Sequence, residues 1–174
     1  MPMMSINTEK KIIVDADVII HFSKGEQLFL LPQIFPNRLC ILKDVFLEVF
    51  KGVLRTEIEK LLQMNFLEEI DFSSDIDVIK EYAKLKKMFG PGESACMAYC
   101  KFHQDVLASS NLKDIKQYCK DNGITYLTTM DFLNAAFEKQ LLNENECDYF
   151  IFNVLSRGSK LPFKTLADYR KSVL

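Results

Sequence analysis

Residues 11–22 read KIIVDADVIIHF, and this stretch decides the fold of the chain. The β-branched run at residues 12–14 predicts a short buried strand, which ends at the carboxylate of Asp15. A second acid, Asp17, follows two residues later. Because Asp is rare in strand interiors, we expect Asp15 at the carboxyl end of a strand, where open α/β sheets bind ligands. The alternative interpretation is that Asp15 or Asp17 only caps the following helix.

The composition is that of an ordinary globular protein. The 174 residues are 48% hydrophobic and 26% charged, which predicts one domain over residues 1–174. The helical pattern of the tail, residues 143–174, is expected to form a C-terminal extension of this domain. The formal net charge of −2 gives no case for indiscriminate nucleic-acid binding, although a local basic patch is compatible with it. The N-terminal MPMMSINTEKK lacks the apolar segment of a secretory signal, and no run approaches membrane-spanning length. We therefore expect a cytoplasmic protein without membrane contact.

The cysteines give no sign of a disulfide framework or of a zinc site. They are five in number, and their spacings match no metal or disulfide template: Cys40, Cys96, Cys100, Cys119 and Cys147. Cys96 and Cys100 share one face of a predicted helix, but no His or Cys pair lies near them in the sequence. We interpret them as reduced thiols that pack in the core.

Short apolar runs alternate with amphipathic stretches along the whole chain. The predicted strands are residues 12–14, 38–42, 66–72, 106–108 and 124–127. The predicted helices are residues 17–23, 27–34, 45–52, 55–65, 75–88, 93–103, 113–121, 132–141 and 145–155, with a short last helix. In addition, Asp44 is expected to cap its helix, and Ile76, Ile79, Ala83 and Leu85 to face the core. The alternation predicts a parallel sheet with helices on both faces.

Three acids stand beside apolar residues at a strand end or in a helix: Asp15, Glu48 and Glu93. Each has an ordinary explanation, since Glu48 could be a solvated helix residue and Glu93 could favour a helix N-terminus. If they converge, each close pair repels by about 4 kcal/mol at an effective dielectric near 20, and a counter-charge is needed. Oxygen ligands without His or Cys favour a hard cation such as Mg²⁺ or Mn²⁺.

Four segments together resemble the PIN domain, a metal-dependent ribonuclease fold. They are VDADVIIHF at 14–22, VFLEVFKG at 45–52, GPGESACMAYC at 90–100 and YCKDNGITYLTTMDFL at 118–133. The order and spacing of the four carry the resemblance, which covers about residues 12–142. The run from Gly90 to Glu93 looks like the subgroup with a Gly-x-Gly-Glu signature. The resemblance implies a three-layer α/β/α fold with a mostly parallel sheet of four to five strands.

The resemblance also implies a metal site. Asp15, Glu48 and Glu93 match the family's first three metal-binding acids and are the expected catalytic residues. The fourth position departs from the family, because Ser110 and Asn111 stand where one or two Asp are usual. Either side chain can offer a neutral oxygen to a metal or to its waters, but neither brings negative charge, so metal affinity and activity are expected to fall.

Three nearby acids are candidate substitutes for the missing charge: Asp114, Asp131 and Asp17. Asp114 and Asp131 have an alternative explanation as residues that favour a helix N-terminus. Asp17 is the most local substitute, because it follows Asp15 by two residues.

The activity that the resemblance implies is hydrolysis of an RNA phosphodiester with one or two divalent ions held by the acids. No protein nucleophile is needed, and neither His21 nor His103 has an obvious catalytic arrangement. Phosphate contacts would need positive charge near the acids, although a solvated surface is the alternative for each candidate. These candidates are Lys24, Lys51, Arg55, Lys113 and Lys116.

The resemblance implies RNA as substrate, and it suggests a toxin role with an antitoxin partner and a homodimer. A second interpretation is a catalytically impaired relative that binds RNA or a protein. A third is an unrelated α/β domain that binds a phosphorylated ligand through Mg²⁺. The third is the weakest, since no Gly-rich phosphate loop follows the first strand.

Overall fold

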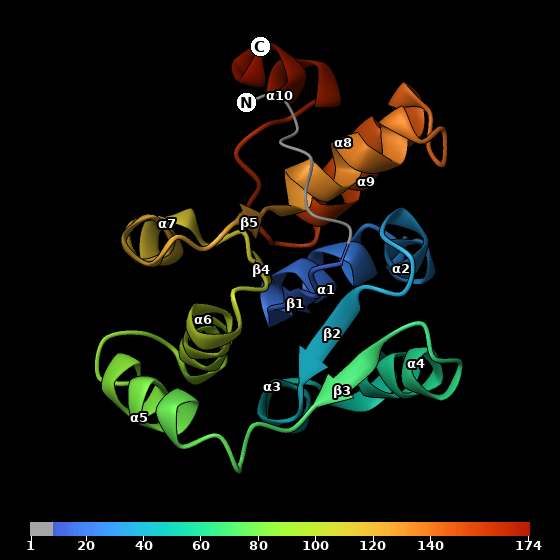
Figure 1. The fold of residues 1–174 in the computed structure, drawn as a ribbon. Helices are drawn as coiled ribbons and strands as arrows, with labels where there is room; N and C mark the ends of the chain where they lie inside the picture. The colour runs from blue at the N-terminus through green and yellow to red at the C-terminus, as the bar shows by residue number, and fades with distance from the viewer. Residues whose placement is uncertain (1–8) are drawn as a thin grey trace.

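The computed structural model describes residues 9–174, apart from the side chain of Glu48. Most of the N-terminal segment that was examined for a secretory signal lies outside the described residues. Five parallel strands form one sheet in the order β3-β2-β1-β4-β5 (Figure 1). They are β1 (Ile12–Val14), β2 (Leu39–Leu42), β3 (Glu68–Ile70), β4 (Val106–Ala108) and β5 (Tyr126–Leu127). The expected parallel α/β sheet is confirmed.

Helices cover both faces of this sheet, as the right-handed crossovers of a parallel sheet require (Figure 1). The first half of the chain supplies α1 (Ala16–Lys24), the 3-10 turn η1 (Leu28–Leu30), α2 (Leu31–Ile34), α3 (Lys43–Val49), α4 (Gly52–Gln63) and α5 (Ile76–Leu85). The second half supplies α6 (Pro91–His103), α7 (Leu112–Asn122), α8 (Thr129–Glu138), α9 (Glu144–Ser156) and α10 (Leu166–Val173). Helix α6 packs on β1 and β4 between α5 and α7, whereas α1 contacts α8 and α9.

The core is continuous from the sheet to the C-terminal helices. All three residues of β1 are fully buried, as their β-branched run predicts. Phe22 of α1 lies 6.0 Å from Phe132 of α8 and 5.0 Å from Phe150 of α9, measured between ring centroids. These three rings are also fully buried, so the C-terminal helices share the core of the sheet.

Two details of the helix predictions are wrong. Helix α3 begins at Lys43 with Leu42 as its N-cap, so Asp44 lies in the first turn and does not cap the helix. Helix α5 carries apolar residues on two sides, and the structure buries the side with Val78 and Leu85. The expected inward residues Ile76 and Ile79 are 66% and 38% exposed, and Ala83 is exposed too.

The reason is a tertiary contact that periodicity does not report. Asp75 caps α5 through the Val78 amide at 3.2 Å, and its other oxygen lies 3.0 Å from Nε2 of His103 at the end of α6. This partly exposed pair joins the start of α5 to the end of α6, and the packing of the two helices buries Val78 and Leu85. Among the described residues, no helix is long and apolar enough to cross a membrane.

Candidate active site

Asp15 occupies the carboxyl end of β1, as the sequence predicts. Its amide donates to the Ala108 carbonyl at 2.8 Å, which continues the β1–β4 ladder by one residue. Its Oδ1 accepts from the Ala16 amide at 2.8 Å, so Asp15 is also the N-cap of α1. Asp15 therefore stands at the strand end and also caps α1, and the residue is only 5% exposed. A carboxylate at this depth is costly to ionise.

Asp17 connects the start of α1 to the loop after β4. Its Oδ2 accepts from the Ser110 amide at 2.7 Å and lies 3.4 Å from Oγ of Ser109, while its Oδ1 accepts from the Val18 amide at 2.7 Å. The position of Asp17 just after a strand is a weak sequence signal for a contact with a neighbouring loop. That this loop is residues 109–111 follows only from the fold. Asp17 thereby places negative charge beside the loop that lacks the family's fourth acid.

Glu93 reaches the same end of the sheet from α6. A side-chain carbon at Gly92 would lie 3.6 Å from Oδ1 of Asp15 and 3.6 Å from Cγ2 of Val45 in α3. The first turn of α6 therefore rests directly against the carboxylate of Asp15. Pro91 at the first helical position starts this helix, and Glu93 lies in its first turn, where a negative charge is favoured.

Asp15 is repelled by Asp17, and Glu93 by Asp15 and Asp114, in a poorly hydrated region. Burial, followed by the charge of Asp17, raises the pKa of Asp15 to about 7. Burial, followed by the charges of Asp15 and Asp114, raises the pKa of Glu93 to about 7. Burial also raises the pKa of Asp17. Such a group of carboxylates is stabilised by a cation, which offsets the mutual repulsion.

The loop at the fourth position, residues 109–111, is engaged in structural contacts. The hydroxyl of Ser110 donates to Oγ1 of Thr129 at 2.7 Å and accepts from the Thr129 amide at 2.9 Å, so it anchors the start of α8. Asn111 donates to Oδ2 of Asp114 at 2.9 Å, and its hydrogen bond to Glu93 lowers the pKa of that acid. Of the substitutes considered, Asp114 is thus the one linked to Glu93.

Two of the other predicted residues lie elsewhere. Asp131 forms a capping box with Thr128 and accepts a hydrogen bond from the Tyr169 hydroxyl, so both of its oxygens are engaged at the start of α8. Lys24 is nine residues beyond Asp15, a rise of about 13 Å along α1, and donates to Oγ of Ser159 at 2.7 Å. It therefore does not lie at the carboxyl end of the sheet, where the sequence analysis expected it.

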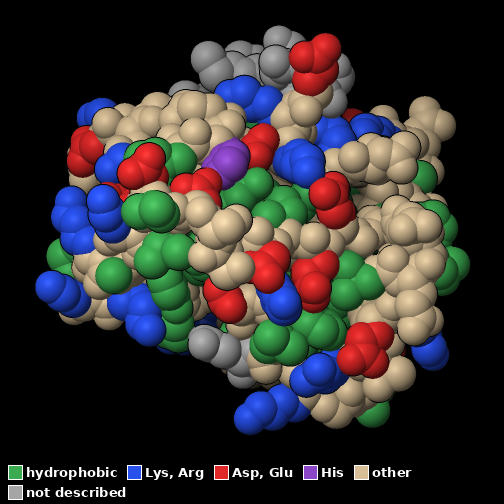
Figure 2. Space-filling model, turned by 60° about the horizontal axis from the view of Figure 1, so that its bottom comes forward, with side chains coloured by type: hydrophobic (Ala, Val, Ile, Leu, Met, Phe, Trp, Pro, Cys, Tyr) green, Lys and Arg blue, Asp and Glu red, His purple; other side chains and the backbone are tan. Residues whose placement is uncertain are grey.

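The remaining predicted basic residues differ in their partners. Arg55 pairs with Glu59 at 3.1 Å and lies over the ring of Phe46, with 5.1 Å from Cζ to the centroid. Lys51 is exposed at the N-cap of α4, and Lys113 and Lys116 are exposed in α7. Figure 2 shows one face of the molecule, where basic and acidic side chains are interspersed with hydrophobic ones. No single charge dominates that face.

Glu48 is the third of the expected acids, and its side chain lies outside the described part of the structure. Its backbone belongs to α3, the helix that supplies Val45 beside Gly92. Within the described residues, no group of three or more acids, His or Cys side chains is arranged to hold a metal ion. Asp15 and Glu93 are the catalytic candidates that the described structure brings together.

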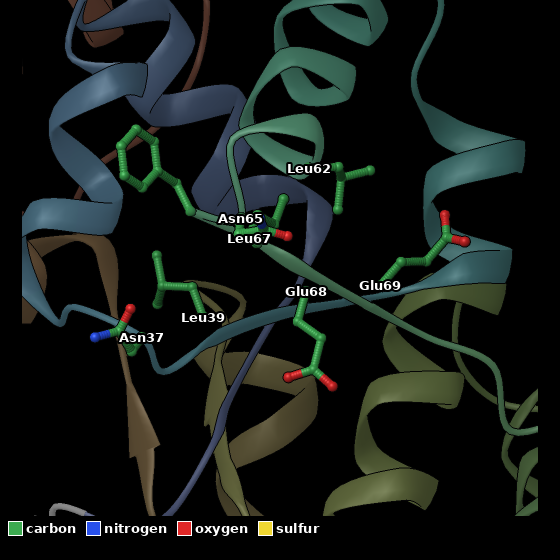
Figure 3. Close-up of a pocket in the computed structure, with 8 residues that line it drawn as sticks. Asn37, Leu39, Leu62, Asn65, Leu67, Glu68 and Glu69 are labelled. Carbon is green, nitrogen blue, oxygen red and sulfur yellow. The ribbon is translucent and has the colours of Figure 1, made fainter.

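A cavity of about 530 Å³ lies elsewhere, beside the edge strand β3 (Figure 3). Glu68 and Glu69 of β3 point to opposite sides of the strand, and Leu39 and Leu62 line the apolar part. Glu68 is paired with Lys11 at 3.0 Å. None of the predicted site residues lines this cavity.

A family model described as a PIN domain matches residues 11–167 of the chain. The chain belongs to the PIN domain family. Members of this family are usually metal-dependent nucleases that use divalent metal ions. No curated protein and no solved structure matched the chain.

The donor set of this PIN domain fits a hard divalent cation. Asp15 and Glu93 offer carboxylate oxygens whose pKa values are raised by burial and by neighbouring negative charge. The hydrogen bonds of Asp15 and Glu93 involve amide, hydroxyl and carboxyl groups. The neighbouring Cys96 thiol stays protonated, because burial, followed by the charge of Asp15, raises its pKa well above the usual value. Oxygen-only donors are the ones that Mg²⁺ and Mn²⁺ prefer.

Proposed function

We propose that this PIN domain is a divalent-metal-dependent ribonuclease that hydrolyses RNA phosphodiesters. The observation that carries the proposal is the proximity of Asp15 and Glu93 at the carboxyl end of the sheet: Gly92, which precedes Glu93, packs against Oδ1 of Asp15, and the charge of Asp15 acts on Glu93. Glu48 on α3 is the expected third acid. Asp114 and Asp17 supply further charge near them.

The acids have separable tasks in this proposal. Asp15 and Glu93 hold a Mg²⁺ or Mn²⁺ ion, and Asp17 fixes loop 109–111 at the edge of the site. When bound, such an ion lowers the pKa of a coordinated water and neutralises charge on the phosphate. The enclosed position of Asp15 limits the access of bulk water, which strengthens its electrostatic interactions. No side chain has to act as a nucleophile.

The test is cleavage of a fluorescently labelled single-stranded RNA in the presence of Mn²⁺ or Mg²⁺. Asp15→Asn and Glu93→Gln should each lower the cleavage rate by about 100-fold or more, because each removes a charged metal ligand. Glu144→Gln changes an exposed acid in α9 and should cleave as the wild type does. Cleavage that survives EDTA, or that is unchanged in Asp15→Asn, would contradict the proposal.

A second readout does not depend on turnover. Mn²⁺ that binds only the folded wild type should raise its melting temperature, because a ligand at 100 times its Kd stabilises by about 2.7 kcal/mol. This shift should disappear in Asp15→Asn and remain in Glu144→Gln. Equal shifts in all three proteins would place the metal elsewhere.

The alternative function is binding without catalysis. It is favoured by one observation, the absence of an acid at Ser110 and Asn111, whose side chains are engaged with Thr129 and Asp114. In that case the wild type binds RNA or a protein partner but does not cleave RNA with either metal. We further propose, on family grounds alone, a toxin role with an antitoxin partner, a homodimer and a cytoplasmic location.

A further inference from the structure

Five lysines gather at the end of the molecule that carries Glu93. We call them the lysine patch, and they are Lys84, Lys86 and Lys87 at the end of α5, with Lys113 and Lys116 in the first turns of α7. All five are exposed. Of these five lysines, only Lys113 and Lys116 were expected near the acids from the sequence, because the position of α5 beside the acids depends on the fold.

The arrangement of three helices brings the two groups of lysines together. Helix α6 lies between α5 and α7, and the Tyr118 hydroxyl of α7 donates to Glu81 of α5 at 2.9 Å across it (Figure 1). Lys84 follows Glu81 by three residues, and Lys116 precedes Tyr118 by two. Helix α5 ends near the start of α6, and α7 begins just after the end of β4. The lysines at the end of α5 and those at the start of α7 therefore lie on the same side of this hydrogen bond, toward Glu93.

Chain connectivity limits how far the α5 lysines can be from the acids. Three peptide units separate Lys87 from Gly90, the N-cap of α6, so their Cα atoms are at most about 11 Å apart. Gly92 in turn packs against Asp15. On the other side, Lys113 directly precedes Asp114, whose charge raises the pKa of Glu93. Positive side chains therefore flank Glu93 from two helices.

The α5 lysines of the patch outnumber the acids beside them, and, against the effect of burial, the pKa of Glu81 is lowered by hydrogen bonds from Lys101 and Tyr118 and then by the charges of Lys101 and Lys84. Residues 80–87 contain four lysines and one acid, Glu81, which already pairs with Lys101 at 3.1 Å and with the Tyr118 hydroxyl. The ion pairs that the described residues form include no member of the patch. Exposed positive charge beside buried acids favours the binding of a polyanion whose phosphate then approaches the acids.

We propose that the lysine patch binds the backbone phosphates of a single-stranded RNA on both sides of the phosphate that the acids address. This inference rests on the proposed function, since it assigns the substrate contacts of the same site. A single strand is favoured because Asp15 is 5% exposed, and a flexible backbone can bend into such a recess more readily than a duplex can.

The test is a binding measurement in EDTA, where no cleavage occurs. Fluorescence anisotropy with a labelled 20-nucleotide oligouridine compares the wild type with Lys84→Gln/Lys86→Gln/Lys87→Gln over a range of salt concentrations. A matched control, Lys160→Gln/Lys164→Gln/Lys171→Gln, removes the same charge from exposed positions at the C-terminal end. Circular dichroism verifies that both triple variants are folded.

The patch variant should bind at least about tenfold more weakly at 100 mM salt, and its salt slope should fall by about 2, since each phosphate contact on a single strand contributes about 0.7. The control should lose less than about twofold. An unlabelled duplex RNA should compete less well than unlabelled oligouridine. Equal losses in both variants, wild-type binding by the patch variant, or stronger competition by the duplex would overturn the inference.

The outcome for the nuclease proposal is separate. If the wild type binds oligouridine through the patch but cleaves no RNA with Mn²⁺ or Mg²⁺, the patch stands and the nuclease proposal fails. If the wild type cleaves RNA and the patch variant binds normally, only the patch is wrong.

Discussion

At the residue scale, the buried carboxylate of Asp15 lowers the stability of the metal-free protein at neutral pH. Its pKa of about 7 lies above the ordinary value of 3.8, so the folded state retains a proton that the unfolded chain releases near pH 4. The proton bound to Asp15 therefore contributes fully to the free energy of unfolding below about pH 4, and this contribution is lost as the pH rises through 7. Asp15→Asn removes this charge and keeps a good N-cap for α1.

We expect Asp15→Asn to be more stable than the wild type at pH 8 in EDTA, by on the order of 2 kcal/mol. Urea denaturation at pH 5 and pH 8 measures the difference, which should shrink at pH 5. Glu144→Gln should match the wild type at both pH values. If Asp15→Asn is less stable than the wild type at pH 8, then contacts in the folded protein offset the cost of burying the ionised Asp15 carboxylate.

His21 has the opposite dependence on pH. Burial, and then the charge of Lys24, lowers its pKa from 6.5 to about 4, and its Nδ1 lies 2.8 Å from Oγ1 of Thr129. Because the folded pKa is depressed, the stabilising contribution is present above pH 6.5 and is lost as the pH falls toward 4.

His21→Gln loses the packing of the imidazole ring. Glutamine has no group that takes up a proton between pH 7 and pH 4, so the variant lacks the acid-dependent loss of stability that His21 causes. The stability deficit of this variant should therefore narrow by about 2 kcal/mol between pH 7 and pH 4.5. Urea denaturation of variant and wild type at the two pH values measures it, and Asp15→Asn is the comparison because its difference changes in the other direction. A constant deficit would mean that folding does not change the pKa of His21.

At the element scale, the contact between α1 and α9 depends on one glycine. Gly25 is the C-cap of α1, and a side-chain carbon there would lie 2.2 Å from Cδ2 of Phe150, whose ring is fully buried. Gly25→Ala should cost about 2–3 kcal/mol, because a rigid ring in a packed core cannot move aside cheaply.

A double-mutant cycle in urea checks this assignment. In the Phe150→Leu background, Gly25→Ala should cost clearly less than it does alone, because the smaller side chain leaves room for the added carbon. The backbone at Gly25 has φ −76°, which any residue adopts, so strain in the backbone does not explain a loss. Additive costs would contradict a clash with Phe150.

The elements also show where sequence reasoning succeeds. The β1 strand and the places of Asp131 and Glu93 in the first turns of α8 and α6 follow from local chemistry, and the structure contains them. The inward face of α5 could not be predicted, because both of its sides carry apolar residues and the packing of α5 against α6 decides between them.

The features of the site also differ in whether they follow from the local sequence or depend on the fold. The places of Asp15 at a strand end and of Glu93 at a helix start follow from local chemistry, whereas their pairing was implied only by the resemblance to the PIN domain. The bond from the Ser110 amide to Asp17, and the link from Asp114 through Asn111 to Glu93, could not be predicted, because they depend on how separate loops meet. Lys24 was misplaced for the same reason, since the direction of α1 carries it away from the acids.

At the scale of the whole molecule, the C-terminal helices complete the core of the sheet. Phe150 of α9 packs on Phe22, and the Tyr169 hydroxyl of α10 bonds Asp131 at the start of α8. We therefore propose that residues 1–174 form one cooperative domain, in which residues 143–174 extend and cover the helices next to the sheet. The amide of Leu166 donates to Asp148 at 2.8 Å, which fixes the direction of the segment between α9 and α10.

Two truncations separate the contributions of these helices. Residues 1–164 lack only α10 and should keep one cooperative unfolding transition at a lower denaturant midpoint, because α9 still covers Phe22. Residues 1–142 would expose the Phe22 ring, which packs on Phe150 and whose burial is worth about 1.5–3 kcal/mol, and should show no cooperative transition in urea by circular dichroism. A cooperative transition near the wild-type midpoint in residues 1–142 would make residues 143–174 a separable appendage, since cooperativity then would not require the aromatic contact between α1 and α9.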